Sequence, residues 1–246
     1  MMLSMELKLS PKAKFFLQQG LRQDRAGEYV AAIASLDLAL LCEPEYADAW
    51  SQRGLILGKL GKHYEAIINF DKALAIRPDA YSAWYNRGIA LGKLGDYKAA
   101  INSFDRAIEF KPDTGIFWHN LGVAFLECGC YEKAVKSFDR ALKFKLDNHW
   151  AWYNRGKALL QLKQYEHALN SFDRAIEFKP DFFLAWLHQG ITLSDRGCYE
   201  KAVASFNRAI EINPNYQPAW YNKGIALEKL GCYSQASACF DKINLS

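Results

Sequence analysis

Apolar residues recur along the chain at intervals of three and four residues, the spacing that places side chains on one face of an α-helix. In residues 81–114, one such stripe consists of Trp84, Gly88 and Leu91, and a second apolar set falls within residues 100–108. The two sets predict two helices. Because the turn between them is short, the helices are expected to pack antiparallel.

Glycine and proline mark the expected ends of these two helices. Gly95 follows the first helix and can adopt the positive φ that a helix C-terminus often requires. Pro112 follows the second helix and cannot continue it.

The whole pattern returns every 34 residues. One position of the pattern is phenylalanine in the first copy, Phe16, and tryptophan in every later copy: Trp50, Trp84, Trp118, Trp152, Trp186 and Trp220. A second is always glycine: Gly20, Gly54, Gly88, Gly122, Gly156, Gly190 and Gly224. A third is proline except at Leu146: Pro44, Pro78, Pro112, Pro180 and Pro214. The glycine that ends the first helix also recurs, except in the fifth copy, where Lys163 predicts a strained turn.

The chain therefore divides into an N-terminal extension, 1–12, and a repeat region, 13–246. We expect seven repeats: 13–46, 47–80, 81–114, 115–148, 149–182, 183–216 and a shortened 217–246. Positions are numbered from the first residue of each repeat, and the two helices of a repeat are called helix A and helix B. At the front, Ser10 and Pro11 predict an N-cap and a first helical residue. The preceding segment, MMLSMELKL, is expected either to cap the first repeat or to fray.

Antiparallel packing predicts which positions face each other within a repeat. Glycine at position 8 should face the aromatic residue at position 24, as Gly88 faces Phe104, so that the helices approach closely. The basic residue at position 7 should face the aspartate at position 25 of the same repeat, as in Arg87 and Asp105. We therefore expect an ion pair inside the repeat that fixes helix register and stabilises it by roughly 0–1 kcal/mol.

The segment WYNRGIALGKLGDYKAAINSFDRAIEFKP, residues 84–112, resembles a tetratricopeptide repeat (TPR), and the resemblance recurs seven times over residues 13–246. It implies an all-α fold, a right-handed α-solenoid superhelix of antiparallel helix pairs, with helix A on the concave side and helix B on the convex side. Such repeats are stabilised by stacking on their neighbours. The last helix is accordingly expected either to associate with a second copy, giving a homo-oligomer through the terminal repeat, or to face further protein.

Composition excludes several classes of protein. The chain is 50% hydrophobic, too apolar for disorder, and its net charge of +4, from 31 basic and 27 acidic residues, is not that of a nucleic-acid binder. No apolar run reaches the roughly 20 residues that span a bilayer, so no membrane association is expected. The N-terminus lacks the pattern of a secretory signal, so we expect a cytoplasmic protein with reduced cysteines.

No catalytic, metal or cofactor site is predicted. The sequence contains no phosphate-binding glycine loop, no HExxH and no Gly-x-Ser-x-Gly, and its five histidines share no ligand spacing. Cys130, Cys198 and Cys232 recur at position 16, too far apart in stacked repeats for a disulfide. We interpret them as reduced turn residues that descend from one ancestral repeat.

The concave face carries two regular rows. Position 6 is an amide in all but one repeat: Gln18, Gln52, Asn86, Asn120, Asn154, His188 and Asn222. Position 9 is apolar in all but one: Leu21, Leu55, Ile89, Val123, Lys157, Ile191 and Ile225. The amides could hold a peptide backbone and the apolar row alternate side chains, an arrangement similar to the Asn ladder of the O-linked N-acetylglucosamine transferases. Alternatively, position 9 packs on the next repeat and position 6 is only solvated.

Charge at position 13 refines the hypothesis. Repeats one to three carry Arg25, Lys59 and Lys93, and later repeats include Glu127 and Asp195. Acidic ligand residues are therefore expected against the first three repeats. Aromatic side chains at the rim could add contact area: Tyr85, Trp150, Tyr153 and Tyr221.

The sequence thus favours a non-catalytic scaffold that binds an extended or helical segment of a partner protein in its concave groove. Two alternatives remain. The chain could be the targeting region of a larger modular enzyme, or a helical-repeat RNA-binding protein. The second requires a basic groove, which Glu127 and Asp195 argue against.

Overall fold

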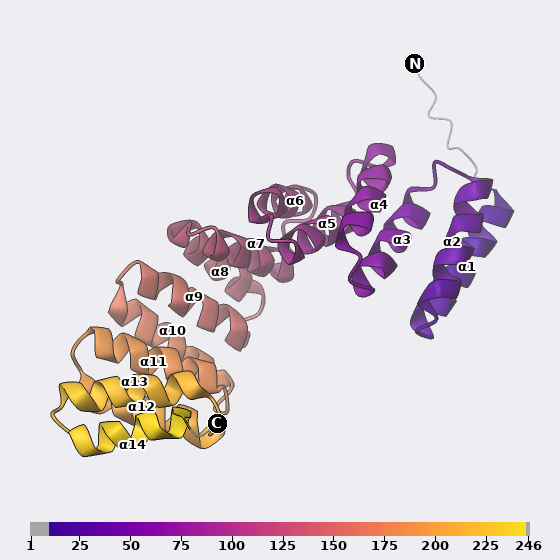
Figure 1. Cartoon of the computed structure of the whole chain (residues 1–246). Helices are drawn as coiled ribbons and strands as arrows, with labels where there is room; N and C mark the ends of the chain where they lie inside the picture. Colours follow the sequence, from indigo (N-terminus) through magenta and orange to yellow (C-terminus); the bar gives the residue numbers. More distant parts are fainter. Residues whose placement is uncertain (1–9, 245–246) are drawn as a thin grey trace. The chain divides into compact units, whose positions relative to one another are not determined.

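The computed structural model describes residues 10–244, which form helices joined by short turns and contain no strand. Seven helices occupy the A positions: α1 (Pro11–Arg25), α3 (Ala47–Lys59), α5 (Tyr81–Lys93), α7 (Gly115–Glu127), α9 (His149–Gln161), α11 (Phe183–Asp195) and α13 (Gln217–Lys229). Seven occupy the B positions: α2 (Tyr29–Cys42), α4 (His63–Ile76), α6 (Tyr97–Phe110), α8 (Tyr131–Phe144), α10 (Tyr165–Phe178), α12 (Tyr199–Ile212) and α14 (Tyr233–Asn244). The all-α, paired-helix fold is as predicted (Figure 1).

The described residues form two compact units, one that ends at Ala124 and one that begins at Phe125, so the boundary falls within α7. Within each unit, an A helix packs on its own B helix and on the B helix of the preceding repeat, as α5 packs on α6 and on α4. Pro11 begins α1 as expected, but the Ser10 side chain makes no capping hydrogen bond. The segment MMLSMELKL lies outside the described residues.

The turns from helix A to helix B have the predicted backbone conformation. At Gly95, φ is +80°. The Asp96 N–H donates to the Leu91 carbonyl, and the Gly95 N–H donates to the Gly92 carbonyl, which is the Schellman arrangement. Lys163 takes the same station in the fifth repeat and adopts a φ of 57°, in the left-handed region that a side chain disfavours.

Close approach of the two helices in each repeat depends on the glycine at position 8. A Cβ added to Gly88 would lie 2.6 Å from the Phe104 ring, and one added to Gly156 would lie 2.6 Å from the Phe172 ring. Both rings are buried, at 3% and 0% exposure. The predicted pairing of small with large residues is therefore correct.

The tryptophans at position 4 join neighbouring repeats. Trp50 packs, partly buried, against the cores on both sides of it. Its indole N–H also donates to the Pro44 carbonyl of the preceding repeat, at 2.8 Å. Trp152 makes the same bond to the Leu146 carbonyl, at 2.7 Å, although no proline stands there. This hydrogen bond was not predicted from the sequence.

The predicted ion pair inside the repeat is wrong. The Arg87 Nε donates to Asp71 of the preceding repeat at 2.7 Å, and the Arg87 Nη1 donates to the Ser103 hydroxyl of its own repeat at 2.8 Å. Arg53 with Asp37 and Arg155 with Asp139 repeat this arrangement. Because helix A lies between two B helices, a long side chain at position 7 reaches the aspartate of the earlier one. The bond therefore links adjacent repeats.

Candidate functional site

The amides of position 6 are oriented by their own helices. The Nδ2 of Asn86 donates to the Ser82 carbonyl at 2.9 Å, and the Nδ2 of Asn222 donates to the Pro218 carbonyl at 2.7 Å. This bond fixes the plane of the amide and leaves its Oδ1 turned away from the helix backbone. Of the predicted row, Gln18 is exposed and the others are half-buried: Gln52, Asn86, Asn120, Asn154, His188 and Asn222.

Two members of the row are engaged by an aromatic side chain of the preceding repeat. The Asn120 Nδ2 donates to the Tyr85 hydroxyl at 2.9 Å as well as to the Ile116 carbonyl. The Nδ1 of His188 lies 3.3 Å from the Tyr153 hydroxyl. Burial lowers the pKa of the His188 imidazole, because the charged form loses solvation.

The residues of position 9 are half-buried in every repeat: Leu21, Leu55, Ile89, Val123, Lys157, Ile191 and Ile225. They are neither sealed in the core nor fully exposed. Lys157, the exception in the row, places its ammonium 5.8 Å from the centre of the Tyr153 ring.

Lys59 and Lys93, two of the three predicted basic residues, differ in their partners. The Lys59 ammonium contacts both carboxylate oxygens of Asp24, at 2.7 and 2.8 Å. Lys93 is exposed and makes no ion pair within residues 10–244. Asp24 was not predicted as a partner of Lys59, because it belongs to the preceding repeat and occupies position 12 rather than position 13.

The expected aromatic rim is only partly formed. Tyr221 and Trp150 are exposed, at 54% and 45%. Tyr153 is 5% exposed and packs against Phe172 and Phe182, so its expected place at the rim is wrong.

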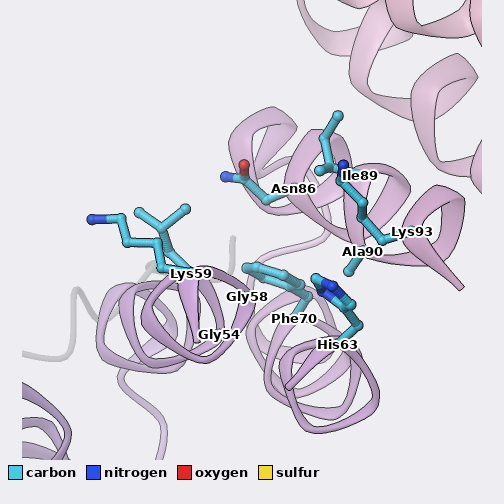
Figure 2. Close-up of a pocket in the computed structure, with 10 residues that line it drawn as sticks. Gly54, Gly58, Lys59, His63, Phe70, Asn86, Ile89, Ala90 and Lys93 are labelled. Carbon is cyan, nitrogen blue, oxygen red and sulfur yellow. The ribbon is translucent and has the colours of Figure 1, made fainter. Parts of the chain in front are cut away.

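A hollow of about 240 Å³ opens in the N-terminal unit between α3, α4 and α5. It brings together five predicted residues: Leu55, Lys59, Asn86, Ile89 and Lys93. Its remaining lining was not predicted: Gly54, Gly58, His63, Phe70 and Ala90. In Figure 2, the Phe70 ring lies between the helices with the His63 ring beside it, and the Lys59 side chain on α3 extends away from the ring.

The sequence did contain a signal for one missed residue. Position 17 is tyrosine in every repeat except the second, where it is His63. This single departure lies at the hollow.

Within residues 10–244, no group of three or more His, Cys, Asp or Glu side chains is arranged to hold a metal ion. All six cysteines are free thiols. None of the described helices combines the length and the apolar character that a bilayer crossing requires.

Family models identify the class of protein. A model described as tetratricopeptide repeat matches residues 47–80, 81–114 and 149–182, and one described as TPR repeat matches 124–163 and 190–231. The chain belongs to the tetratricopeptide repeat family. This family and its fold support a protein-interaction scaffold in general. No curated protein matches the chain significantly.

Solved structures share the fold. A tetratricopeptide repeat protein from Parabacteroides merdae ATCC 43184 is similar with a TM-score of 0.72 and 18% identity, over 95% of this chain and 92% of that one. YrrB, described as a TPR protein with an unusual peptide-binding site, is similar with a TM-score of 0.69 and 23% identity, over 76% of this chain and 97% of that one. MamA from Desulfovibrio magneticus RS-1 is similar with a TM-score of 0.67 and 23% identity, over 71% of this chain and 98% of that one.

Proposed function

We propose that the chain is a non-catalytic scaffold that binds an extended or helical segment of a partner protein along its A helices. The observation that carries this proposal is the hollow beside α3 and α5, where an oriented amide, two apolar side chains and an unpaired lysine meet. An amide can accept from and donate to a peptide backbone, while the apolar side chains bury those of the ligand. YrrB, a neighbour in fold, is described as having a peptide-binding site.

Charge indicates which segments fit. Lys93 and Arg25 are exposed, so acidic residues of the ligand are favoured along the first three repeats. Because exposed charges are screened by salt, raising the ionic strength from about 0.05 M to about 0.5 M should weaken such a ligand several-fold. The cytoplasmic location and the lack of enzymatic activity expected from the sequence belong to the same proposal.

The test is selection of peptides from a randomised phage-displayed library, followed by fluorescence anisotropy with the labelled peptides. Asn86→Ala should weaken binding roughly fivefold, the effect of losing a hydrogen bond of about 1 kcal/mol. Asn102→Ala is the matched control, because Asn102 is an exposed asparagine on α6. Equal affinity of the two variants would contradict the proposed site. Failure of every library peptide to bind would contradict the proposed function.

A further inference from the structure

Two residues of the second repeat that line the hollow are smaller than residues found at the same positions in other repeats. Position 17 is a tyrosine in the other six: Tyr29, Tyr97, Tyr131, Tyr165, Tyr199 and Tyr233. In the second repeat it is His63, whose ring is smaller. Position 12 is glycine in this repeat and the next, at Gly58 and Gly92, and leucine in repeats four and five, at Leu126 and Leu160.

Both residues leave space that a larger side chain would fill. Tyr29 and Tyr199 are partly buried and pack against core residues. The imidazole of His63, at the same station, lines the hollow together with Phe70 (Figure 2). A Cβ added to Gly58 would meet no atom within 4 Å, so the space beside this glycine is open.

The size of the hollow suits one large apolar side chain. Its volume is about 240 Å³, and its floor and walls include Leu55, Phe70 and Ile89. For comparison, a sealed protein cavity of about 150 Å³ that is lined by leucine, isoleucine and phenylalanine binds benzene. A leucine, methionine or phenylalanine side chain therefore fits.

Lysines at the edge of the hollow favour particular residues next to the apolar residue in the ligand. Lys59 and Lys93 both line it, and only Lys59 is paired with a carboxylate, that of Asp24. Among residues 10–244, no acidic residue lines the hollow. A ligand with carboxylates beside its apolar residue would complement the Lys93 ammonium.

We propose that the second repeat holds an anchor pocket for a large apolar side chain flanked by aspartate or glutamate in the partner peptide. The proposal rests on the proposed function and specifies its ligand class. His63 and Gly58 are the residues that create the pocket, and Lys93 supplies the charge.

The test restores the residues that other repeats carry. Gly58→Leu and His63→Tyr, singly and together, refill the pocket. Both variants should fold, because leucine is favoured over glycine in a helix and tyrosine is the usual residue at position 17. Circular dichroism and the melting temperature verify this. Gly92→Leu is the matched control, because Gly92 also occupies position 12, also faces open space and does not line the hollow.

The probes are fluorescein-labelled nonapeptides with a central leucine between pairs of glutamates, with alanine at the centre, or with lysines in place of the glutamates. The wild type should bind the acidic leucine peptide at least tenfold more tightly than either of the others. The double variant should lose this preference and Gly92→Leu should keep it.

Two results would overturn the anchor pocket. One is equal affinity of the wild type and the double variant for the acidic leucine peptide. The other is no binding of this peptide when library-selected peptides do bind. Either result leaves the proposed function intact, because that function is tested separately, by whether any peptide selected from the library binds.

Discussion

Lys163 is a residue whose backbone conformation opposes its side chain. It occupies a station where six repeats carry glycine at positive φ, and it adopts a φ of 57°. Lys163→Gly should stabilise the protein by roughly 0.5–1 kcal/mol, since the left-handed strain exceeds the entropy that glycine loses on folding. Urea denaturation measures the difference. Gly95→Lys should shift stability in the opposite direction, and a neutral or destabilising Lys163→Gly would contradict the account.

His188 makes stability depend on pH. Burial lowers the pKa of its imidazole in the folded state, so the unfolded chain binds a proton more readily. The neutral imidazole therefore contributes to the free energy of unfolding above the pKa that His188 has in the unfolded chain, about 6.5. This contribution is lost as the pH falls below that value.

His188→Asn restores the amide found at this station in other repeats. The variant should lose less stability than the wild type between pH 7 and pH 5, measured by denaturant titration at each pH. Parallel pH profiles for the two proteins would show that His188 does not titrate as described.

Among elements, the arginines at position 7 should couple neighbouring repeats. A double-mutant cycle of Arg87→Ala with Asp71→Ala should show a coupling energy of about 0.5 kcal/mol, since both groups are partly exposed. A cycle of Arg53→Ala with Asp71→Ala should show none, although these two residues belong to one repeat. Coupling in the second cycle and not in the first would restore the pairing that the sequence suggested.

The end of helix α8 shows that proline is not required to stop a B helix. α8 ends at Phe144, as its counterparts do, and Lys145 is extended, with φ −144° and ψ 90°. That conformation also suits a residue before proline. Leu146→Pro should therefore stabilise the protein by about 0.4–1 kcal/mol through the unfolded state. Thermal unfolding is the measurement, and a lower melting temperature would contradict it.

Most of the fold could be predicted at the level of the element. Helix ends, the glycine turns and the contact of Gly88 with Phe104 follow from local chemistry repeated seven times. The partner of Arg87 could not be predicted in the same way, because pairing within one repeat ignores the B helix of the previous repeat. The burial of Tyr153 was not predicted for a related reason. Tyr153 lies on α9 and is covered by Phe182, which follows α10, the B helix of the same repeat.

The candidate site was predicted in part. Positions 6, 9 and 13 identified five residues that line the hollow, since regular helices place equivalent residues alike. His63 was missed because the prediction followed what the repeats share, and His63 is where the second repeat departs from them. Gly58 was missed because position 12 varies among the repeats and belongs to none of the predicted rows.

At the scale of the whole molecule, α1 and α14 carry exposed polar residues at positions that are buried or half-buried in the other repeats. Position 10 is buried from the second repeat onward, as at Ala90 and Ala158, but Arg22 occupies it in α1 and is exposed. On α14, Ser237 is exposed at a station that holds Ile67 in α4. Association through the terminal repeat remains a prediction, and light scattering across a range of concentrations tests it. A monomeric mass throughout would contradict it.

The central claim is that the A helices of the N-terminal unit hold a partner peptide. Site-specific photo-crosslinking tests it most directly. Benzoylphenylalanine would replace Ile89 beside the hollow or, as the control, Asn102 on α6. With a library-selected peptide, the account predicts an efficient crosslink from the first position and little from the second. Equal crosslinking from both positions, or crosslinking from α6 alone, would contradict it.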